Sequence, residues 1–258
     1  MGRAAPEWSN KKRELLVCTA GITKNLEWRR LYPIFIEDIE NIHGFSWVDV
    51  KVTREGLQDA RPESRKVVRE YGPYLTEVGN VKDEGVRKWY AENLVKDCVE
   101  VMKPLRQTIG IVKPIIESFE LMEVEPTSKT DEEQTTLSAW ASFSNEKETE
   151  EKWKINYAKK DFEVRCKFKC GSSCQLKHHD MKVLDIEFFM LYRHVFKKYQ
   201  DMNITFQKMK EKLEKELEAK DFYFVLGSHS RYPFHSYMIG SVLRFKKDLQ
   251  MMAPSEVT

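Results

Sequence analysis

The sequence predicts an α+β protein with two β-rich lobes and packed helices. Short apolar or alternating segments, which are typical of strands, recur in both halves of the 258-residue chain. Only a few segments have helical spacing, and an acidic polar segment separates the two halves. A hydrophobic fraction of 41% and a charged fraction of 33% are compatible with a packed core under a well-solvated surface.

Residues 12–125 are predicted to form an N-terminal, strand-rich lobe with one long helix. Four segments have the apolar or alternating pattern of strands: 14–22, 28–34, 46–52 and 109–125. Apolar side chains recur at intervals of three or four over 83–108, and Asp83 stands at the position of a helix N-cap. We therefore expect a single helix over 83–108.

Residues 126–152 are predicted to be an acidic flexible linker or insert. They are rich in Ser, Thr and Glu, and the part from 129 to 152 holds seven acidic residues and three lysines. The rest of the chain then has 40 basic and 34 acidic residues, a net charge of +6, against +2 for the whole chain. A basic body of this kind is compatible with nucleic-acid contact, and also with an ordinary soluble protein.

Residues 153–250 are predicted to form a C-terminal α+β lobe. Apolar side chains and cysteines alternate with charged ones over 163–170, which predicts a half-buried strand with Arg165, Lys167 and Lys169 on its outer face. Two helices and two further strands are expected in this order: 188–199, 203–220, 221–227 and 235–245.

Cysteine and histidine are concentrated near the predicted strand at 163–170. A turn after Cys170 brings Cys174 back toward it, and His178 and His179 follow within five residues. Zinc is bound by four thiolate or imidazole ligands in a tetrahedron. The spacing therefore favours a structural zinc site that fixes a loop of the C-terminal lobe, with Cys170, Cys174 and His178 or His179 as ligands.

The fourth ligand and the presence of a metal stay open at this point. Cys166 lies on the same strand face as Cys170, and His229 or His235 from a later loop are alternatives. The cysteines are also compatible with burial in the core without a metal. A catalytic metal would need an open coordination position beside a base.

Acidic residues that follow the cysteines suggest a second kind of chemistry. Asp180, Asp185 and Glu187, with His179, are candidates for binding magnesium in phosphodiester hydrolysis. A simpler interpretation is that Asp185 caps a helix that starts near Ile186, with Glu187 in its first turn.

Three stretches of the chain resemble an uncharacterised family of archaeal and bacterial proteins. They are "LVCTAGITKNLEWRRLYPI…SWVDVKV…DARPES", "FKCGSSCQLKHHDMKVLDIEF" and "FYFVLGSHSRYPFHSYMIG". The chain departs from the family pattern at Ile186, where a tryptophan is usual, and in a shorter cysteine spacing. The opening stretch also resembles proteins with paired oligonucleotide-binding (OB) folds, which implies OB-like or barrel-like lobes and a role in nucleic-acid repair or anti-invader defence.

The second resemblance implies that single-stranded DNA or RNA is the partner. Arginines on such a sheet would contact the phosphate backbone and aromatic rings would stack on bases. The basic strand at 163–170 and the loop between the last two predicted strands are expected to add further contacts. All residues predicted to contact nucleic acid are Trp28, Arg29, Arg30, Tyr32, Arg61, Arg65, Arg165, Lys167, Lys169, His229, Arg231, Tyr232 and His235.

Three hypotheses about function follow. The first is a nucleic-acid-binding protein with a structural zinc ion as its cofactor. The second is a metal-dependent nuclease or related hydrolase that uses Asp180, Asp185, Glu187 and His179. The third is an assembly subunit that offers the helix at 203–220 to a protein partner. The sequence lacks an apolar run of membrane-spanning length and a signal segment, so we expect a cytoplasmic protein with no membrane partner.

Overall fold

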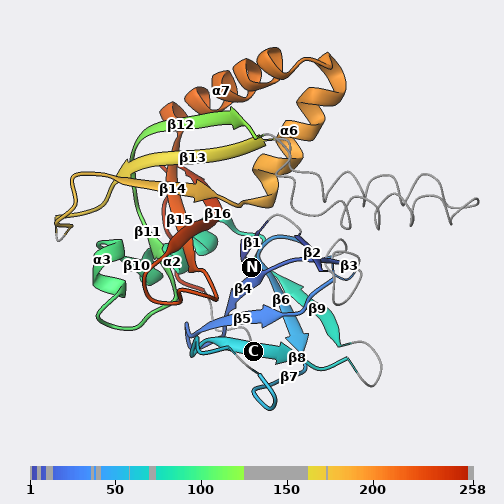
Figure 1. The fold of residues 1–258 in the computed structure, drawn as a ribbon. Helices are drawn as coiled ribbons and strands as arrows, with labels where there is room; N and C mark the ends of the chain where they lie inside the picture. Colours follow the sequence, from blue (N-terminus) through green and yellow to red (C-terminus); the bar gives the residue numbers. More distant parts are fainter. Residues whose placement is uncertain are drawn as a thin grey trace, which may run out of the picture.

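The computed structural model describes residues 2–4, 7–9, 14–35, 38, 42–57, 59–69, 74–124, 162–172 and 174–254. The linker predicted at 126–152 lies outside these ranges. The described residues form a mixed α+β fold with several sheets and few helices, which confirms the predicted class. Figure 1 shows the N-terminal strands below the strands and helices of the second half of the chain.

The N-terminal strands form one five-stranded sheet and two strand pairs. The order in the five-stranded sheet is β1 (Gly2–Arg3), β4 (Thr19–Ile22), β5 (Trp28–Tyr32), β8 (Ser64–Val67), β7 (Val52–Thr53). The two pairs are β2 (Glu7–Ser9) with β3 (Glu14–Leu16), and β6 (Ser46–Val50) with β9 (Leu75–Asn80).

A seven-stranded sheet occupies the rest of the chain. Its order is β10 (Val95–Lys96), β11 (Ile109–Val112), β15 (Lys220–Ser228), β16 (Tyr237–Lys246), β14 (His179–Val183), β13 (Phe162–Lys169), β12 (Ile115–Glu123). The helices are α2 (Glu84–Leu94), α3 (Val99–Met102), α6 (Ile186–Tyr199) and α7 (Met202–Ala219).

The connection between β11 and β12 forces this sheet to curl. Two residues, 113 and 114, join the strands, so the end of β11 and the start of β12 lie within about 11 Å of each other. In the order of the sheet they are five steps apart, which would be about 24 Å if the sheet were flat. The sheet therefore curls toward a barrel, although no sheet in the described ranges closes on itself by strand pairing.

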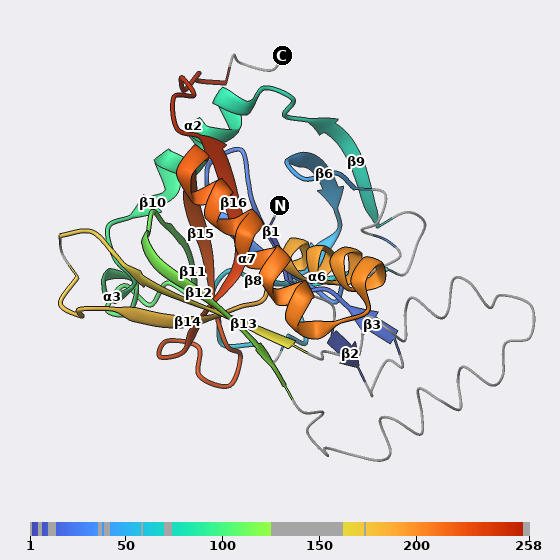
Figure 2. The same cartoon turned by 90° about the horizontal axis from the view of Figure 1, so that it is seen from above.

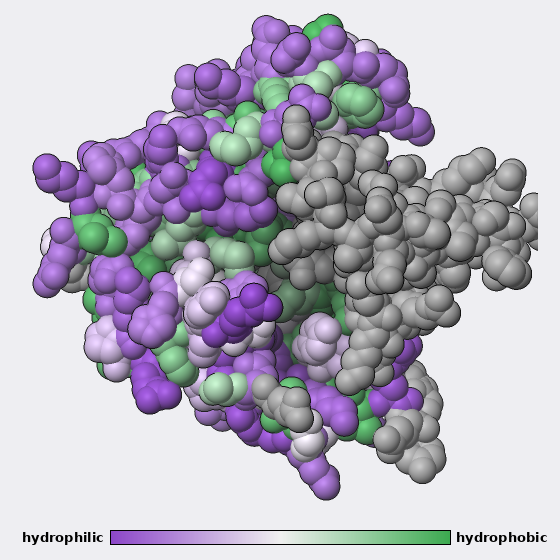
Figure 3. All heavy atoms as spheres, in the orientation of Figure 1, coloured by the Kyte–Doolittle hydropathy of each residue, from purple (hydrophilic) through white to green (hydrophobic). Residues whose placement is uncertain are grey.

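Apolar packing between the curled sheet and two helices forms the main core. Alternate side chains of β13 are buried, as the pattern over 163–170 predicts, and Phe168 is fully buried. Helices α6 and α7 lie together over one side of the sheet, where Phe188 and Leu213 join the same cluster (Figure 2). Each such side chain contributes roughly 1.5–3 kcal/mol by burial. Figure 3 shows mainly hydrophilic residues on the outside of these helices.

The helix predicted over 83–108 is interrupted. Helix α2 ends at Leu94, and the next two residues pair with β11 as β10. Cys98 is then extended, with φ of −153°, and its sulfur accepts a hydrogen bond from the backbone N–H of Glu100 at the start of α3. Tertiary strand pairing therefore overrides the helical spacing of the apolar residues.

Asp185 connects α6 to the centre of the sheet. It is the N-cap of α6, and its Oδ1 accepts a hydrogen bond from the N–H of Glu187 at 2.6 Å, as the simpler interpretation of the sequence expects. Its Oδ2 accepts bonds from Ser241 Oγ at 3.1 Å and from the N–H of Val242 at 2.6 Å. Burial, with a smaller effect of nearby Glu187, raises the pKa of Asp185 to about 6.

We expect Asp185→Ala to lower the free energy of unfolding by about 2–4 kcal/mol, because it removes a cap and leaves two buried donors of β16 unpaired. Asp201→Ala is the matched control. Asp201 caps α7 at an exposed position through one bond, to the N–H of Ile204, and its loss should cost about 1 kcal/mol. Urea denaturation measures both values, and equal losses would contradict the role of Asp185 as a link between α6 and β16.

Candidate metal centre and arginine-lined cavity

Four side chains of metal-binding type meet beside the curled sheet. The ligating atoms of Cys98, Cys170, Cys174 and His179 all lie within 4.8 Å of one another. His179 Nε2 is 3.1 Å from the sulfur of Cys174 and 3.9 Å from that of Cys98. Tetrahedral zinc, with Zn–S bonds of about 2.3 Å, places its ligand atoms about 3.5–3.8 Å apart. The cluster therefore has the dimensions of a site for one zinc-sized ion.

The four residues come from two parts of the chain. Cys98 precedes α3, whereas Cys170 directly follows β13 and His179 begins β14, with Cys174 in the loop between these two strands. The ring of Phe168 stacks on that of His179, with centroids 5.2 Å apart, and so helps to orient the imidazole. A bound ion would join the β13–β14 hairpin to the segment between β10 and α3.

Gly171 allows the hairpin to approach this segment closely. Its N–H donates to the carbonyl of Asp97 at 2.8 Å, and its own carbonyl accepts from the N–H of Cys174 at 3.2 Å. A Cβ at position 171 would lie 1.8 Å from Oδ1 of Asp97 and 3.0 Å from its carbonyl oxygen. A larger residue would displace the carboxylate of Asp97 and press on its carbonyl, so glycine favours the close approach of Cys170 and Cys174 to Cys98.

The electrostatics of the cluster suit a cation. Burial raises the pKa values of the Cys98 and Cys170 thiols, and it lowers the pKa of His179. The imidazole is therefore held in the neutral form that binds metals. A divalent cation would supply the positive charge that favours the thiolates, because a coordinated thiol loses its proton.

Three of the predicted ligands, Cys170, Cys174 and His179, are brought together, but His178 and Cys166 are not. His178 is exposed, and its Nδ1 lies 2.7 Å from a carboxylate oxygen of Glu117 on β12. Cys166 lies four residues before Cys170, about 13 Å away along an extended strand. Its thiol contacts the carbonyl of Lys167 instead.

Cys98 is the ligand that the sequence prediction missed. It lies 81 positions before His179, inside the segment predicted as one long helix. Its only sequence signal is a place in an apolar pattern, which predicts burial rather than metal binding. His229 and His235, the other predicted alternatives, lie in the exposed β15–β16 loop and do not belong to the cluster.

The four residues proposed for hydrolysis do not form a joint site in the described part of the chain. His179 belongs to the sulfur cluster, and Asp180 pairs with Arg165 at 2.9 Å. Asp185 is engaged with β16, and Glu187 pairs with Arg244 at 2.6 Å. Their carboxylates are used in separate structural contacts, so the geometry gives a magnesium site no support.

A second polar feature is a cavity of about 630 Å³ between the five-stranded sheet and strands β14, β15 and β16. Five of the residues predicted to contact nucleic acid line it: Arg30, Tyr32, Arg61, Arg65 and His229. They come from β5, from the segment around β8 and from the loop after β15. The fold therefore brings together residues that are as much as 199 positions apart in the sequence.

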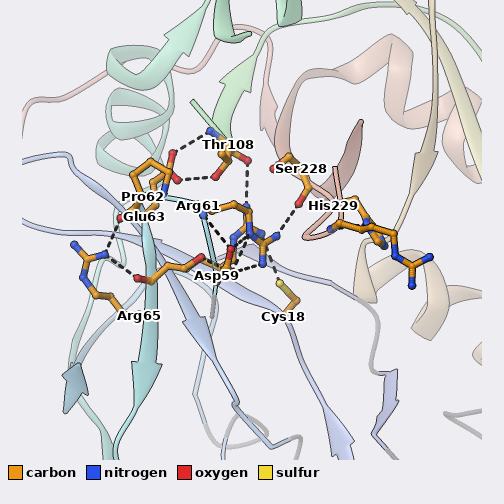
Figure 4. A network of polar contacts seen from close by, with 12 residues as sticks. Cys18, Asp59, Arg61, Pro62, Glu63, Arg65, Thr108, Ser228 and His229 are labelled. Carbon is orange, nitrogen blue, oxygen red and sulfur yellow. Dashed lines mark hydrogen bonds and ion pairs between the residues drawn. The ribbon is translucent and has the colours of Figure 1, made fainter. Parts of the chain in front are cut away.

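Arg61 connects the two sides of this cavity (Figure 4). Its Nε and Nη2 donate to Asp59 at 2.9 and 2.6 Å, and its Nη1 donates to the carbonyl of Ser228 at 2.8 Å. Burial alone would raise the pKa of Asp59, but hydrogen bonds from Arg61 and Ser64 lower it to about 2. Asp59 thus stays ionised and holds Arg61 against the end of β15.

The other predicted nucleic-acid contacts lie elsewhere. On the outer face of β13, Arg165, Lys167 and Lys169 pair with the acidic residues Asp180, Glu120 and Glu117, so much of the positive charge there is neutralised locally. Arg29 pairs with Glu27, and Trp28 lines a separate apolar pocket. Arg231, Tyr232 and His235 are exposed in the β15–β16 loop.

Two protein families match the chain. The domain of unknown function DUF8758 matches residues 1–93, and the domain of unknown function DUF8757 matches residues 92–256. The second match covers more than half of the chain. The chain belongs to the DUF8757 family. The four residues of the metal centre all lie within the DUF8757 match, whereas residues of both matches line the cavity.

These matches confirm that the family is uncharacterised. No curated protein and no solved structure matches the chain. The archaeal or bacterial origin of the family and the likeness to OB folds stay predictions. No helix among the described residues is long and apolar enough to cross a membrane.

We expect Gly171→Ala to weaken zinc binding by about tenfold or more, because the added methyl group separates the hairpin from Asp97 while all four ligands remain. Gly44→Ala is the control, since a Cβ there would meet nothing within 4 Å. Competition with a chromophoric chelator measures the affinity. Unchanged affinity in Gly171→Ala would show that the close approach does not position the ligands.

Proposed function

We propose that the protein is a zinc-stabilised nucleic-acid-binding protein. The proposed zinc site is supported by the cluster of Cys98, Cys170, Cys174 and His179. Three thiolates and one imidazole are a common ligand set of structural zinc sites. A reducing compartment such as the cytoplasm fits this proposal, because free thiols are needed to bind the metal.

The burial of the cluster favours a structural over a catalytic role for zinc. Cys98, Cys170 and His179 are buried and Cys174 is half-buried. Four protein ligands complete a tetrahedron and leave no position for a water or substrate, which a catalytic zinc requires. The ion would instead fix the β13–β14 hairpin against α3, at the point where the curled sheet brings these two segments together.

The nucleic-acid part of the proposal is supported by the cavity between the two sheets. Arg30, Arg61 and Arg65 line it together with Lys182, against one acidic residue, Asp59. Tyr32 also lines the cavity and is 47% exposed, so its ring is accessible for stacking. Basic groups beside an accessible aromatic ring are what single-stranded nucleic acid requires.

We expect the purified protein to contain one zinc ion per chain. Cys98→Ser should lose most of the zinc and melt at a lower temperature, whereas His178→Ala should keep both the zinc and the melting temperature. Elemental analysis and thermal denaturation test this, with chelator-treated wild type as the metal-free reference. Retention of zinc by Cys98→Ser, or a wild type that takes up no zinc, would disprove the site.

We expect affinity for a single-stranded oligonucleotide to fall as salt rises, with a slope of about −0.7 per phosphate contacted in a double logarithmic plot. Arg65→Ala should reduce the steepness of this slope by about 0.7. Lys169→Ala is the control, since Lys169 pairs with Glu117 and lies away from the cavity. Fluorescence anisotropy at several salt concentrations measures the slope. Affinity that does not change with salt would rule out binding through these arginines.

A further inference from the structure

Two buried donors of the arginine-lined cavity have no hydrogen-bond partner among the described residues. They are Nε of Arg30 and Oγ of Ser228. Arg30 is 5% exposed and Ser228 is 2% exposed, so solvent does not readily replace a partner. A buried guanidinium or hydroxyl that lacks its hydrogen bond is energetically costly, which makes such groups uncommon without a ligand or a functional reason.

Arg30 also lacks an ion-pair partner in the described part of the chain. Its Nη2 donates to the carbonyl of Thr108 at 3.1 Å, and its Nη1 has only the sulfur of Cys18, at 3.7 Å. Glu63 is close but uses its carboxylate on the N–H and hydroxyl of Thr108. Arg61 differs, because Asp59 neutralises it. The guanidinium of Arg30 therefore has no direct ion pair in the described residues, and the charge of Glu63 offsets it only from a distance.

The charged side chains that line the cavity are mainly basic. Three arginines and Lys182 line it with one acidic residue, Asp59, whose oxygens already accept from Arg61 and Ser64, and Lys182 pairs with Glu163 on β13. Burial lowers the pKa of Arg30 below its ordinary value, and the neighbouring charge of Arg61 adds to this effect. An anion in the cavity would compensate this excess of positive charge.

The two unpartnered donors belong to neighbouring parts of the cavity wall. A Cβ at Gly227 would lie 3.5 and 3.8 Å from the Nη atoms of Arg30, so the guanidinium lies directly beside the backbone that leads into Ser228. Arg61 holds the carbonyl of Ser228 from the opposite sheet. Arg30 Nη2 and the backbone N–H of Ser228 also donate to the same carbonyl, that of Thr108, at 3.1 and 2.9 Å, so β5 and the end of β15 meet at one place in the cavity wall.

We propose that this cavity binds a phosphate monoester, with Arg30 and the hydroxyl of Ser228 as donors to its oxygens. The phosphate belongs either to the end of a nucleic-acid strand or to a free mononucleotide. The first possibility rests on the proposed nucleic-acid function, and the second does not. Arginine suits a phosphate because its planar donors match two phosphate oxygens at once.

Burial of the donors favours a monoester over a phosphodiester within a strand. An internal phosphate carries chain on two sides, whereas a terminal phosphate has one covalent link and can enter a recess alone. The volume of about 630 Å³ is within the range of sites for molecules the size of a nucleotide. Tyr32, which lines the cavity and is partly exposed, offers a face for the attached base.

The test uses the full-length, zinc-loaded protein and one single-stranded oligonucleotide in three forms: with a 5′-phosphate, with a 3′-phosphate and with hydroxyl groups at both ends. Fluorescence anisotropy gives the three affinities, and a nucleoside monophosphate and inorganic phosphate serve as competitors. We expect one phosphorylated form to bind about tenfold tighter than the hydroxyl form, and the nucleoside monophosphate to compete with it.

Two variants link this preference to the cavity. Ser228→Ala removes a hydroxyl that has no partner, so it should preserve stability while it reduces the preference for the phosphorylated end. Arg30→Met should abolish the preference, with zinc content and circular dichroism as checks that the variant is folded. Ser236→Ala, in the exposed loop outside the cavity, is the control and should bind as the wild type does.

The outcomes separate this inference from the proposed function. Equal binding of the three oligonucleotides would overturn the phosphate-monoester site and leave general nucleic-acid binding intact. Binding of the nucleoside monophosphate without binding of any oligonucleotide would support the site and overturn the nucleic-acid function. Absence of binding by every probe would overturn both, and an undiminished preference in Ser228→Ala and Arg30→Met would place the phosphate elsewhere.

Discussion

The short connection between β11 and β12 is the constraint on which the rest of the structure depends. Two residues join strands that are five steps apart in the sheet, so the sheet has to curl until its two ends approach each other. This curl encloses the apolar core under α6 and α7. It also carries the segment at Cys98, beyond one end of the sheet, toward the β13–β14 hairpin at the other.

The metal centre lies within one of the two family matches, whereas the cavity is lined by residues of both. The metal centre lies wholly within the DUF8757 match, and a zinc ion there would strengthen a contact that the curl of the sheet already creates. The cavity is formed only where strands of both matches meet, and Arg61 bridges them through the carbonyl of Ser228. The N-terminal strands thus form one wall of the cavity, and the C-terminal part forms the other.

Some basic residues of this protein form ion pairs with carboxylates, whereas Arg30 forms none in the described residues. The outer face of β13 is basic in sequence, but carboxylates of neighbouring strands neutralise it. Arg30 is less conspicuous in sequence, yet it is buried without an acidic partner in the described residues. A buried charge without a direct ion pair is a stronger indication of a ligand than an exposed, paired one, because burial of such a charge is costly.

Local patterns in the sequence determined much of this protein. The alternation over 163–170 predicted β13, Asp185 was expected to cap α6, and the spacing after β13 indicated Cys170, Cys174 and His179. These features depend on residues a few positions apart, whose geometry the backbone fixes. Only the tertiary structure decided that Cys98 completes the cluster, that the helix from 83 stops at Leu94 and that Arg30 and Ser228 share the carbonyl of Thr108. These features follow from strand pairing between distant segments.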